Sequence, residues 1–462
     1  MKKEIILSYP NIIKKYGSFD RLSHVEIFTD SRSPELGNTF LALEGERFNA
    51  MSFLPQIEGK IELVIFRSTE ENQRIFEKYS QLLAIEVDDP VLFLQWVCTQ
   101  YIAQWKKSGG KVITISGSNG KTTTKEMLYF ILRGIFQGDV IATKQNDNNH
   151  LGVPFTILKI KPETKVAVIE LGSNHPGELK TVCEIAQPDI AYVTNIGDTH
   201  LEFFKDQKAV FEEETYPCRW IEKNGGFLLL NKDDPWLSKI KSFALSFAHS
   251  KQADIQLSFE HSSRVVLNDV RAEKNYRLEN PWIHGRHNFF NLVASFLLAR
   301  EVCPDQTCKL LQRAEDFRPT FNRSQWLDYQ GKKVFLDAYN ANPSSMKVSL
   351  EEFATYCHES KIDKAQALIV LGEMKELGEK STNYHRQLGQ LCRDLGFSKV
   401  IYIGNFFVDF ETGFALQTAK HFRSTDQQAK NCFEKCLGES SIVFAKASRS
   451  LKIEELFGLS EH

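Results

Sequence analysis

The sequence predicts an α/β protein of three domains: a small mixed α/β domain at residues 1–85, a central domain at 86–315 and a C-terminal α/β domain at 316–462. Two observations favour this class. A chain of 462 residues is long enough for three domains of ordinary size. From residue 111 onward, short apolar segments alternate with longer amphipathic ones. This alternation is typical of mostly parallel sheets that carry helices on both faces.

The N-terminal domain is predicted from two strand-like segments at 25–28 and 39–43. The polar turn Asp30-Ser31-Arg32 lies between them, and Gly45-Glu46-Arg47-Phe48 follows them. Asp, Ser and Gly are common turn formers, so loop chemistry alone accounts for both turns.

The central domain is predicted from a repeating pattern of strands and helices. A leading helix is expected at 89–107, where apolar side chains recur at helical spacing before two glycines. The following strands are expected at 111–116, 139–143, 165–170, 189–195 and 226–231, and the helices at 120–134, 177–187, 206–223 and 287–301. The short alternating runs at 252–280 predict an antiparallel appendage.

The C-terminal domain shows the same alternation. Its strands are expected at 334–336, 367–371, 400–403 and 442–444, and its helices at 344–357, 382–394 and 426–436. This order predicts a second doubly wound, Rossmann-like domain.

The segment Gly117-Ser118-Asn119-Gly120-Lys121-Thr122-Thr123 joins an apolar strand to a helix. The backbone N–H groups of such a turn, together with the helix dipole, favour an anion. Lys121 would reach the terminal phosphates of a nucleotide, and Thr122 would place its hydroxyl on Mg²⁺. The common spacing would need glycine at Ile115, so the alternative is an ordinary glycine-rich turn. We favour a P-loop ATPase-like central domain that binds a nucleoside triphosphate.

Polar residues also follow other central strands. Glu170 ends the strand at 165–170, and His200 follows the strand at 189–195. Ligands of open α/β sheets bind beyond the carboxyl ends of strands, so both residues would converge with the P-loop on one crevice. Glu170 either positions Mg²⁺ or lies in solvent. His200 either ligates a metal, orients a substrate or is a structural hydrogen-bonding residue.

An asparagine-rich segment follows the strand at 139–143. It contains Asn146, Asn148 and Asn149, and is either a plain loop or a hydrogen-bonding surface for a polar substrate. Later in the chain, Gly285-Arg286-His287-Asn288 begins a helix that includes Asn291. These residues either contact a purine edge or cap the helix.

In the C-terminal domain, Asp337 ends a strand and Tyr339-Asn340-Ala341-Asn342-Pro343 follows it. A strand that ends in Asp before a polar loop is suited to contact a ribose or phosphate across a cleft.

The bulk composition gives no support for a nucleic-acid partner, a structural zinc site or a membrane protein. A formal net charge of -2 gives no argument for a nucleic-acid or membrane partner. The nine cysteines include no C-x-x-C pair, which favours free thiols in a reducing cytoplasm over zinc ligands. The sequence has neither a signal-peptide pattern nor an apolar run near the roughly 20 residues that span a bilayer. A cytoplasmic protein is expected.

Taken in order, these segments resemble the Mur ligase family over nearly the whole chain. The most specific are Glu170-Leu171-Gly172 with Asn174-His175-Pro176-Gly177-Glu178, and Thr194-Asn195-Ile196-Gly197 followed by His200-Leu201-Glu202. Two more matches lie in the C-terminal domain: Leu371–Gly378, near the incoming dipeptide, and Lys446-Ala447-Ser448-Arg449, with Ala447 where the family has glycine. The segment Tyr339–Pro343 is the best marker of the member that adds D-alanyl-D-alanine.

The resemblance implies an ATP-dependent ligase of peptidoglycan precursor synthesis that works as a monomer. The carboxylate of UDP-N-acetylmuramoyl-tripeptide attacks the γ-phosphate of ATP, and an acyl phosphate forms. The amine of D-alanyl-D-alanine then displaces phosphate. Because the reacting groups are anions, catalysis is mostly positioning and charge neutralisation.

The resemblance also implies residue roles. The catalytic residues would be Lys121, Glu170 and His200. ATP would contact Gly117, Ser118, Asn119, Gly120, Lys121, Thr122, Thr123, Asn288, Asn291, Arg323 and Asp337. The substrates would contact Asp30, Ser31, Arg32, Arg47, Asn146, Asn148, Asn149, Asn340 and Asn342. Mg²⁺ would be held by Thr122, Glu170 and His200.

One position departs from the family. Members usually carry a lysine after the His200 equivalent that CO₂ converts to a carbamate, which helps to hold a second Mg²⁺. This chain has Glu214 there, within Glu212-Glu213-Glu214. A carboxylate supplies the charge without modification but lies nearer the backbone. It would therefore act through a water, unless the helix moves inward or Glu213 takes over. The alternative is a solvated helix face and a weak or absent second metal.

Other functions stay open on sequence alone. A sibling Mur ligase or a folate polyglutamate-type ligase would add a single amino acid, and the segment Tyr339–Pro343 argues against both. A non-catalytic nucleotide-binding protein on the same fold is a rival from another class. The third residue of the accepted tripeptide, lysine or diaminopimelate, is not predicted.

Overall fold

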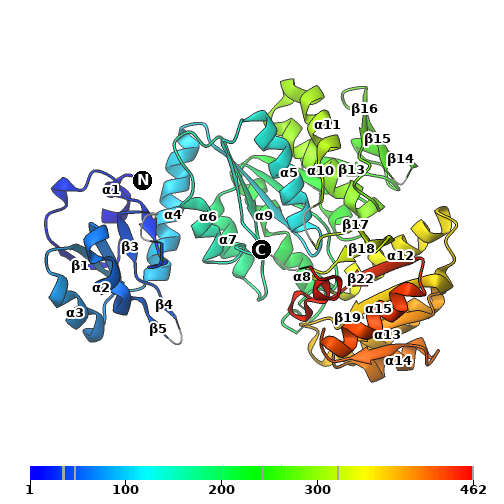
Figure 1. The fold of residues 1–462 in the computed structure, drawn as a ribbon. Coiled ribbons are helices and arrows are strands. Elements are labelled where there is room, and N and C mark those ends of the chain that lie inside the picture. Colours follow the sequence, from blue (N-terminus) through cyan, green and yellow to red (C-terminus); the bar gives the residue numbers. More distant parts are fainter. Residues whose placement is uncertain are drawn as a thin grey trace. The chain divides into compact units, whose positions relative to one another are not determined.

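The structure is a computed structural model that describes residues 1–33, 37–45, 48–200, 202–241, 243–261, 263–319 and 322–459. It has the predicted α/β class (Figure 1). The chain forms two compact units, each described by itself. The first comprises Met1–Thr114, Gly138–Leu171 and Glu178–Asp189, and the second comprises Ile115–Gln137, Gly172–Gly177 and Ile190–His462. The domain boundaries expected near 85 and 315 stay a prediction.

The N-terminal part of the first unit contains a five-stranded sheet of order β1-β7-β6-β3-β2. Only β1 runs antiparallel to its neighbour. Its elements are α1 (Lys3–Leu7), β1 (Ile12–Tyr16), β2 (Ile27–Phe28), β3 (Thr39–Leu41), β4 (Glu44–Gly45), β5 (Phe48–Asn49), α2 (Leu54–Ile57), β6 (Leu63–Arg67), α3 (Glu70–Phe76) and β7 (Leu83–Val87). Phe40, Val64 and Phe66 lie in its buried core.

Helix α4 (Pro90–Lys107) follows this sheet and confirms the predicted leading helix. Asp89 caps it, because its Oδ1 accepts hydrogen bonds from the N–H groups of Val91 at 2.7 Å and Leu92 at 3.1 Å. Phe93 packs edge-on against Tyr9, with ring centroids 5.1 Å apart. The remaining elements of the first unit are β9 (Val140–Ala142), α6 (Gly152–Ile157), β10 (Val166–Glu170) and α7 (Glu178–Ala186).

A nine-stranded sheet has the order β16-β15-β14-β13-β12-β11-β8-β10-β9. Its other strands are β8 (Lys111–Ser116), β11 (Ile190–Val193), β12 (Phe227–Asn231), β13 (Leu245–Ala248), β14 (Ile255–His261), β15 (Arg264–Asp269) and β16 (Lys274–Glu279). Strands β11 to β14 pair in parallel, whereas β14, β15 and β16 pair antiparallel, as the alternating runs predict. The second unit adds α5 (Lys121–Ile135), α10 (Arg286–Val302) and α11 (Thr307–Asp316).

The single helix predicted at 206–223 is wrong, because the structure has two: α8 (Gln207–Glu214) and α9 (Tyr216–Asn224). Pro217 stands in the first turn of α9. Proline has no N–H to donate, and its ring clashes with the carbonyl of the preceding turn, so a continuous helix would be broken there. The break places Glu214 at the end of α8.

The C-terminal part of the second unit is doubly wound, as predicted. Its sheet has the order β17-β18-β22-β19-β20-β21, and only β17 is antiparallel to its neighbour. The elements are β17 (Gln325–Tyr329), β18 (Lys332–Asp337), α12 (Pro343–Glu359), β19 (Ala367–Gly372), α13 (Ser381–Asp394), β20 (Lys399–Ile403), α14 (Phe407–Phe414), β21 (Lys420–Phe422), α15 (Gln427–Gly438) and β22 (Ile442–Lys446).

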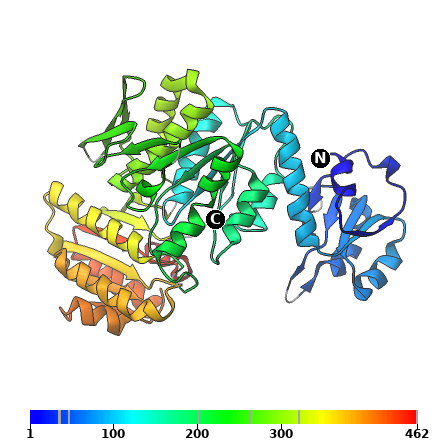
Figure 2. The ribbon, with the colours of Figure 1, turned by 180° about the vertical axis from the view of Figure 1, so that it is seen from behind.

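Both faces of this C-terminal sheet are covered by helices (Figure 2). Successive residues of a strand point to opposite faces, and β18 shows this directly. Phe335 joins the apolar cluster under α12, α13 and α14, whereas Val334 and Leu336 join the cluster under α15. Among the described residues, no helix is both long and apolar enough to cross a membrane.

We predict that Asp89→Ala lowers the free energy of unfolding by about 1 kcal/mol, because two N–H groups of α4 lose their acceptor. Asp89→Asn is the matched variant, since it keeps the cap but loses the ion pair with Arg67 at 2.9 Å. Denaturant unfolding followed by circular dichroism measures both. An alanine variant as stable as the wild type would contradict the capping role.

Candidate active site

The glycine-rich turn between β8 and α5 rests directly on the end of β11. Gly117 has φ +114° and Gly120 has φ +82°, in the left-handed region that favours glycine. A Cβ at Gly117 would lie 2.2 Å from Thr194 Oγ1, and one at Gly120 would lie 2.7 Å from Asn291 Oδ1. Gly117 therefore requires glycine for conformation and for space, and Gly120 requires it for conformation.

Asn195, just after β11, holds the middle of this turn. Its backbone carbonyl accepts a hydrogen bond from the N–H of Ser118 at 2.9 Å. Its side-chain oxygen accepts from the N–H of Asn119 at 3.2 Å, and its amide donates to the Asn119 carbonyl at 2.9 Å. The turn is thus fixed by a strand end before any ligand arrives.

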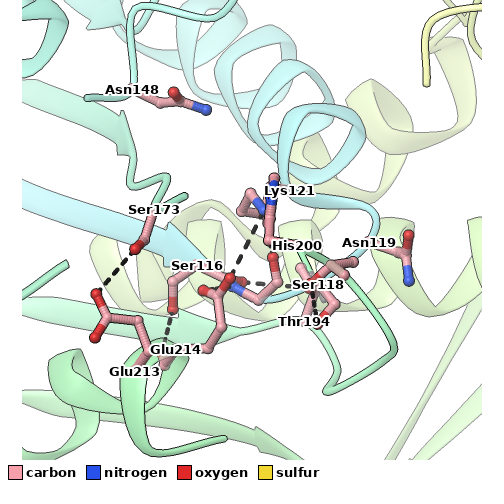
Figure 3. A network of polar contacts seen from close by, with 12 residues as sticks. Ser116, Ser118, Asn119, Lys121, Asn148, Ser173, Thr194, His200, Glu213 and Glu214 are labelled. Atoms are coloured by element: carbon pink, nitrogen blue, oxygen red, sulfur yellow. Dashed lines mark hydrogen bonds and ion pairs between the residues drawn. The ribbon is translucent and has the colours of Figure 1, made fainter. Parts of the chain in front are cut away.

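Glu214 lies against the base of the turn (Figure 3). The N–H of Gly117 donates to Glu214 Oε2 at 2.6 Å, and Ser116 Oγ donates to the Glu214 carbonyl at 2.8 Å. The residue is 3% exposed, so the alternative of a solvated helix face is wrong for Glu214. Burial raises the pKa of its carboxyl, and Lys121 and the Gly117 N–H oppose that rise.

Lys121 begins α5 and points back into the turn. Its Nζ donates to the Gly117 carbonyl and lies 3.9 Å from Glu214 Oε1. The side chain is 15% exposed. A fixed cation and backbone N–H groups at a helix N-terminus form an environment suited to an anion.

The neighbouring carboxylate, Glu213, holds a different segment (Figure 3). Ser173 Oγ donates to Glu213 Oε1 at 2.9 Å, and the N–H of Gly177 donates to Oε2 at 2.8 Å. Adjacent residues of α8 therefore fix two loops, the glycine-rich turn and Gly172–Gly177.

A small pocket beside α5 brings together Thr123, Asn288 and Arg323, three residues predicted to contact ATP. It is lined by Thr123, Glu126, Met127, Ile283, Asn288, Phe317, Pro319, Arg323 and Ser324. The guanidinium of Arg323 lies 3.4 Å from the centroid of the Tyr339 ring. Asn291 is not among the lining residues; its Oδ1 accepts from Thr124 Oγ1 at 3.2 Å and supports the turn instead.

The start of α12 contacts the turn through Asn342. Its amide donates to Asn119 Oδ1 at 2.7 Å, and Asn119 Nδ2 donates to Ser344 Oγ at 2.9 Å. Asn342 also caps α12, where its side chain accepts from the N–H of Ser345 at 2.8 Å. Asn119, which is predicted to contact ATP, is therefore hydrogen-bonded to Asn342, which is predicted to contact the other substrates.

Asp337 and Asn340 meet at Lys446. The Lys446 ammonium, which is almost fully buried, forms an ion pair with Asp337 and donates to the Asn340 carbonyl at 3.0 Å. Lys446 belongs to the segment Lys446–Arg449. The loop after β18 is therefore anchored to the end of β22.

In the first unit, the end of β10 meets the asparagine-rich segment. Asn148 Nδ2 donates to Glu170 Oε1 at 2.9 Å. Glu170 is 2% exposed, so the alternative of a side chain in solvent is wrong. Asn149 precedes α6, and its side chain accepts from the N–H groups of Leu151 and Gly152. Asn146 is exposed.

The N-terminal turn presents an ion pair at the surface. Arg32 Nη2 lies 2.7 Å from Asp30 Oδ2, and this hydrogen bond lowers the pKa of Asp30 to about 2. Ser31, between them, is partly buried. Arg47 lies outside the described residues.

Oxygen donors suited to Mg²⁺ stand at several points: the Thr122 hydroxyl in the first turn of α5, Glu170 at the end of β10 and Glu214 at the end of α8. Mg²⁺ is usually held by one or two carboxylates together with substrate phosphates and water. The described residues contain no group of three or more His, Cys, Asp or Glu side chains that could hold a metal ion. Each of these donors has the oxygen chemistry that Mg²⁺ prefers, and a bound nucleotide would supply phosphate oxygens in addition.

Comparison with known families decides the class. A model of the Mur ligase middle domain matches residues 115–299, and one described as "Mur ligase, glutamate ligase domain" matches residues 322–449. Together they span more than half of the chain. The chain belongs to the Mur ligase family.

Relatives and solved structures of Mur ligases agree with this assignment. The chain is 28% identical over 446 residues to the UDP-N-acetylmuramoyl-tripeptide–D-alanyl-D-alanine ligase of Bacillus subtilis, covering 93% of this chain and 92% of that protein. It resembles MurF from Acinetobacter baumannii with a TM-score of 0.79 and 26% identity, over 94% of this chain and 92% of that one. MurF from Thermotoga maritima in complex with ADP matches with a TM-score of 0.76 over 94% and 96% of the two chains; at 22% identity, this likeness concerns the fold.

The protein is thus an ATP-dependent ligase of the Mur type, and its glycine-rich turn lies inside the matched middle domain. Sequence reasoning missed several residues that build this site. Ser344 and the anchoring role of Lys446 were not predicted, because both depend on contacts between distant segments. The capping pattern Asn342-Pro343-Ser344-Ser345 was the available signal for the start of α12.

We predict that Gly117→Ala weakens ATP binding by at least about tenfold, since the left-handed backbone and the contact with Thr194 each cost on the order of 1 kcal/mol or more. Gly138→Ala is the matched control: its φ is +105°, but a Cβ there would meet nothing within 4 Å. Calorimetric titration with ATP measures the dissociation constants. Equal affinities in the two variants would contradict the close packing of the turn.

Proposed function

We propose that this protein joins D-alanyl-D-alanine to UDP-N-acetylmuramoyl-tripeptide and converts ATP to ADP and phosphate. The observation that carries the proposal is the contact between the segment Tyr339–Pro343 and the glycine-rich turn. The segment marks the dipeptide-adding member of the family, and its Asn342 donates a hydrogen bond to Asn119 of the turn. The likeness to the Bacillus subtilis enzyme over nearly the whole chain supports the same activity.

The reaction has two steps. An oxygen of the tripeptide carboxylate attacks the γ-phosphorus of ATP, the bond to the β–γ bridging oxygen breaks, and ADP leaves. The amine of D-alanyl-D-alanine then attacks the acyl carbon and loses a proton, and phosphate departs with the former carboxylate oxygen. Both steps bring anions together, so cations and N–H donors lower the barrier by offsetting repulsion.

In this proposal Lys121 moves from the Gly117 carbonyl to the terminal phosphates, while the N–H groups of the turn bind the phosphate chain. Asn288 and Arg323, which line the small pocket beside α5, would contact the adenosine end of ATP. Mg²⁺ would be held by Thr122, Glu170, His200 and Glu214, and when bound it neutralises phosphate charge. Asp337, paired with Lys446, would orient the nucleotide from the C-terminal part.

The remaining predicted residues are assigned to the other substrates. The turn Asp30–Arg32, together with Arg47, would bind the UDP moiety. Asn146, Asn148 and Asn149 would contact the muramoyl peptide, and Asn340 and Asn342 the incoming dipeptide. We propose that the reaction takes place in the cytoplasm and that the enzyme is a monomer.

Phosphate release tests the function. The expected result is release that requires both UDP-N-acetylmuramoyl-tripeptide and D-alanyl-D-alanine. Release supported by a single amino acid would favour a sibling or folate-type ligase, and ATP binding without dipeptide-dependent turnover would favour a non-catalytic protein. Assays with the lysine and diaminopimelate tripeptides separately identify the preferred third residue.

Lys121→Ala is expected to abolish ligation while the fold stays intact, because the γ-phosphate loses its cation. Lys223→Ala removes an exposed lysine from the last turn of α9 and should turn over like the wild type. Steady-state rates and thermal unfolding curves report activity and fold. Wild-type turnover in Lys121→Ala would contradict the assignment of Lys121 to phosphate binding.

The wild type is expected to need no bicarbonate, because Glu214 supplies a carboxylate without carbamylation. Glu214→Ala should reduce turnover by at least about tenfold, since the Gly117 N–H loses a charged acceptor worth about 1.5–3 kcal/mol. The control Glu212→Ala changes a carboxylate on the same helix that is 62% exposed. Turnover is measured in CO₂-depleted buffer with and without bicarbonate. Bicarbonate stimulation of the wild type, or full activity in Glu214→Ala, would contradict the proposal that Glu214 replaces the carbamylated lysine.

A further inference from the structure

His200 and Glu376 make a close polar contact between two loops that are far apart in sequence. His200 lies after β11, and Glu376 lies after β19. His200 Nδ1 is 2.7 Å from Glu376 Oε2, and the two side chains are 20% and 52% exposed. The imidazole beside it lowers the pKa of Glu376. The phosphate-binding and C-terminal parts of the second unit thus meet at these two side chains.

Both partners have a left-handed backbone conformation, which is uncommon for residues other than glycine. His200 has φ +51° and Glu376 has φ +60°. A non-glycine residue in this region costs on the order of 1–3 kcal/mol, and such residues cluster where surrounding contacts and function hold them. The same strain on both sides of one contact indicates that the geometry of the pair is maintained by its surroundings.

Three further contacts join the same loops. The N–H of Glu202 donates to the Glu376 carbonyl at 3.4 Å, and Lys380 Nζ donates to the Lys205 carbonyl at 3.3 Å. Tyr384, near the start of α13, lies close to Asp198; burial, with this carboxylate beside it, raises the pKa of the tyrosine. The contact therefore belongs to a seam between residues 198–200 and 202–205 on one side and 376–384 on the other, and is not an isolated surface contact.

Glu214, the carboxylate beneath the glycine-rich turn, lies within electrostatic range of His200. Glu214 in turn accepts the hydrogen bond from Gly117 at the base of the turn. The C-terminal loop, His200 and the phosphate-binding turn therefore lie near one another within the second unit.

The contact with Glu376 decides which ring nitrogen of neutral His200 carries the proton. A carboxylate accepts a proton in a hydrogen bond and cannot donate one, so neutral His200 must carry its proton on Nδ1 when it faces Glu376. Nε2 then has a free lone pair, which is the form that accepts hydrogen bonds and binds cations.

We propose that Glu376 is a positioning residue that acts through His200. Docking of the C-terminal loop fixes the orientation of the imidazole and its Nδ1–H tautomer, which presents Nε2 as an acceptor only when the seam is formed. This inference rests on the proposed ligase function for its kinetic readout, but its structural readout is independent of ligation.

The structural test is the tautomer of His200, measured by nitrogen NMR on full-length enzyme with ¹⁵N-labelled histidine, at a pH where the spectrum itself shows the imidazole to be neutral. His200→Asn assigns the signal. The wild type should show the Nδ1–H form. Glu376→Gln should keep it, because its amide oxygen still accepts, and Glu376→Ala should lose it. Glu379→Gln, an exposed carboxylate on the same loop, is the charge control.

The kinetic test uses the same variants with ATP, UDP-N-acetylmuramoyl-tripeptide and D-alanyl-D-alanine. Glu376→Ala should lower kcat by about tenfold, which is the lower end of the roughly 10–100-fold loss seen when a ligating histidine loses its carboxylate partner. The KM for the tripeptide should change little. Glu376→Gln should recover most of the loss. Wild-type tautomer and kcat in Glu376→Ala, or an equal loss in Glu379→Gln, would overturn the inference. Absence of ligation in the wild type would instead overturn the proposed function.

Discussion

The close contact between Gly117 and the end of β11 is the constraint on which the rest of the site depends. With no room for a Cβ beside Thr194, the turn lies directly on a rigid strand. That position lets Asn195 bind Ser118 and Asn119 through the backbone and side chain. It also presents Asn119 to the start of α12, so that the C-terminal part is fixed relative to the phosphate-binding turn by hydrogen bonds.

The charge distribution around this turn follows from the same packing. Glu214 is buried beneath Gly117, and its negative charge is offset by the Gly117 N–H and by Lys121. A lysine held by a backbone carbonyl and a carboxylate is positioned without a ligand, and a more highly charged phosphate can attract it away. The helix break before Pro217 matters here, because it ends α8 at Glu214.

Much of this arrangement could be predicted from local sequence. The strand–turn–helix around Lys121 and the doubly wound C-terminal part have periodicity and glycine patterns that local physics explains, and both are confirmed as structure. The separation of α8 from α9 was missed, although Pro217 was a visible signal. The partners of Glu214, His200 and Asn342 could not be predicted, because each contact joins residues distant in the chain. The burial of Glu170 and Glu214 likewise depends on tertiary packing.

The central claim is that the turn activates a carboxylate by phosphorylation. The most direct test uses UDP-N-acetylmuramoyl-tripeptide labelled with ¹⁸O in the reacting carboxylate, incubated with ATP and D-alanyl-D-alanine. The account predicts that the released phosphate carries one labelled oxygen, because the carboxylate oxygen attacks the γ-phosphorus and leaves with it. Unlabelled phosphate, formed while ligation proceeds, would contradict the account.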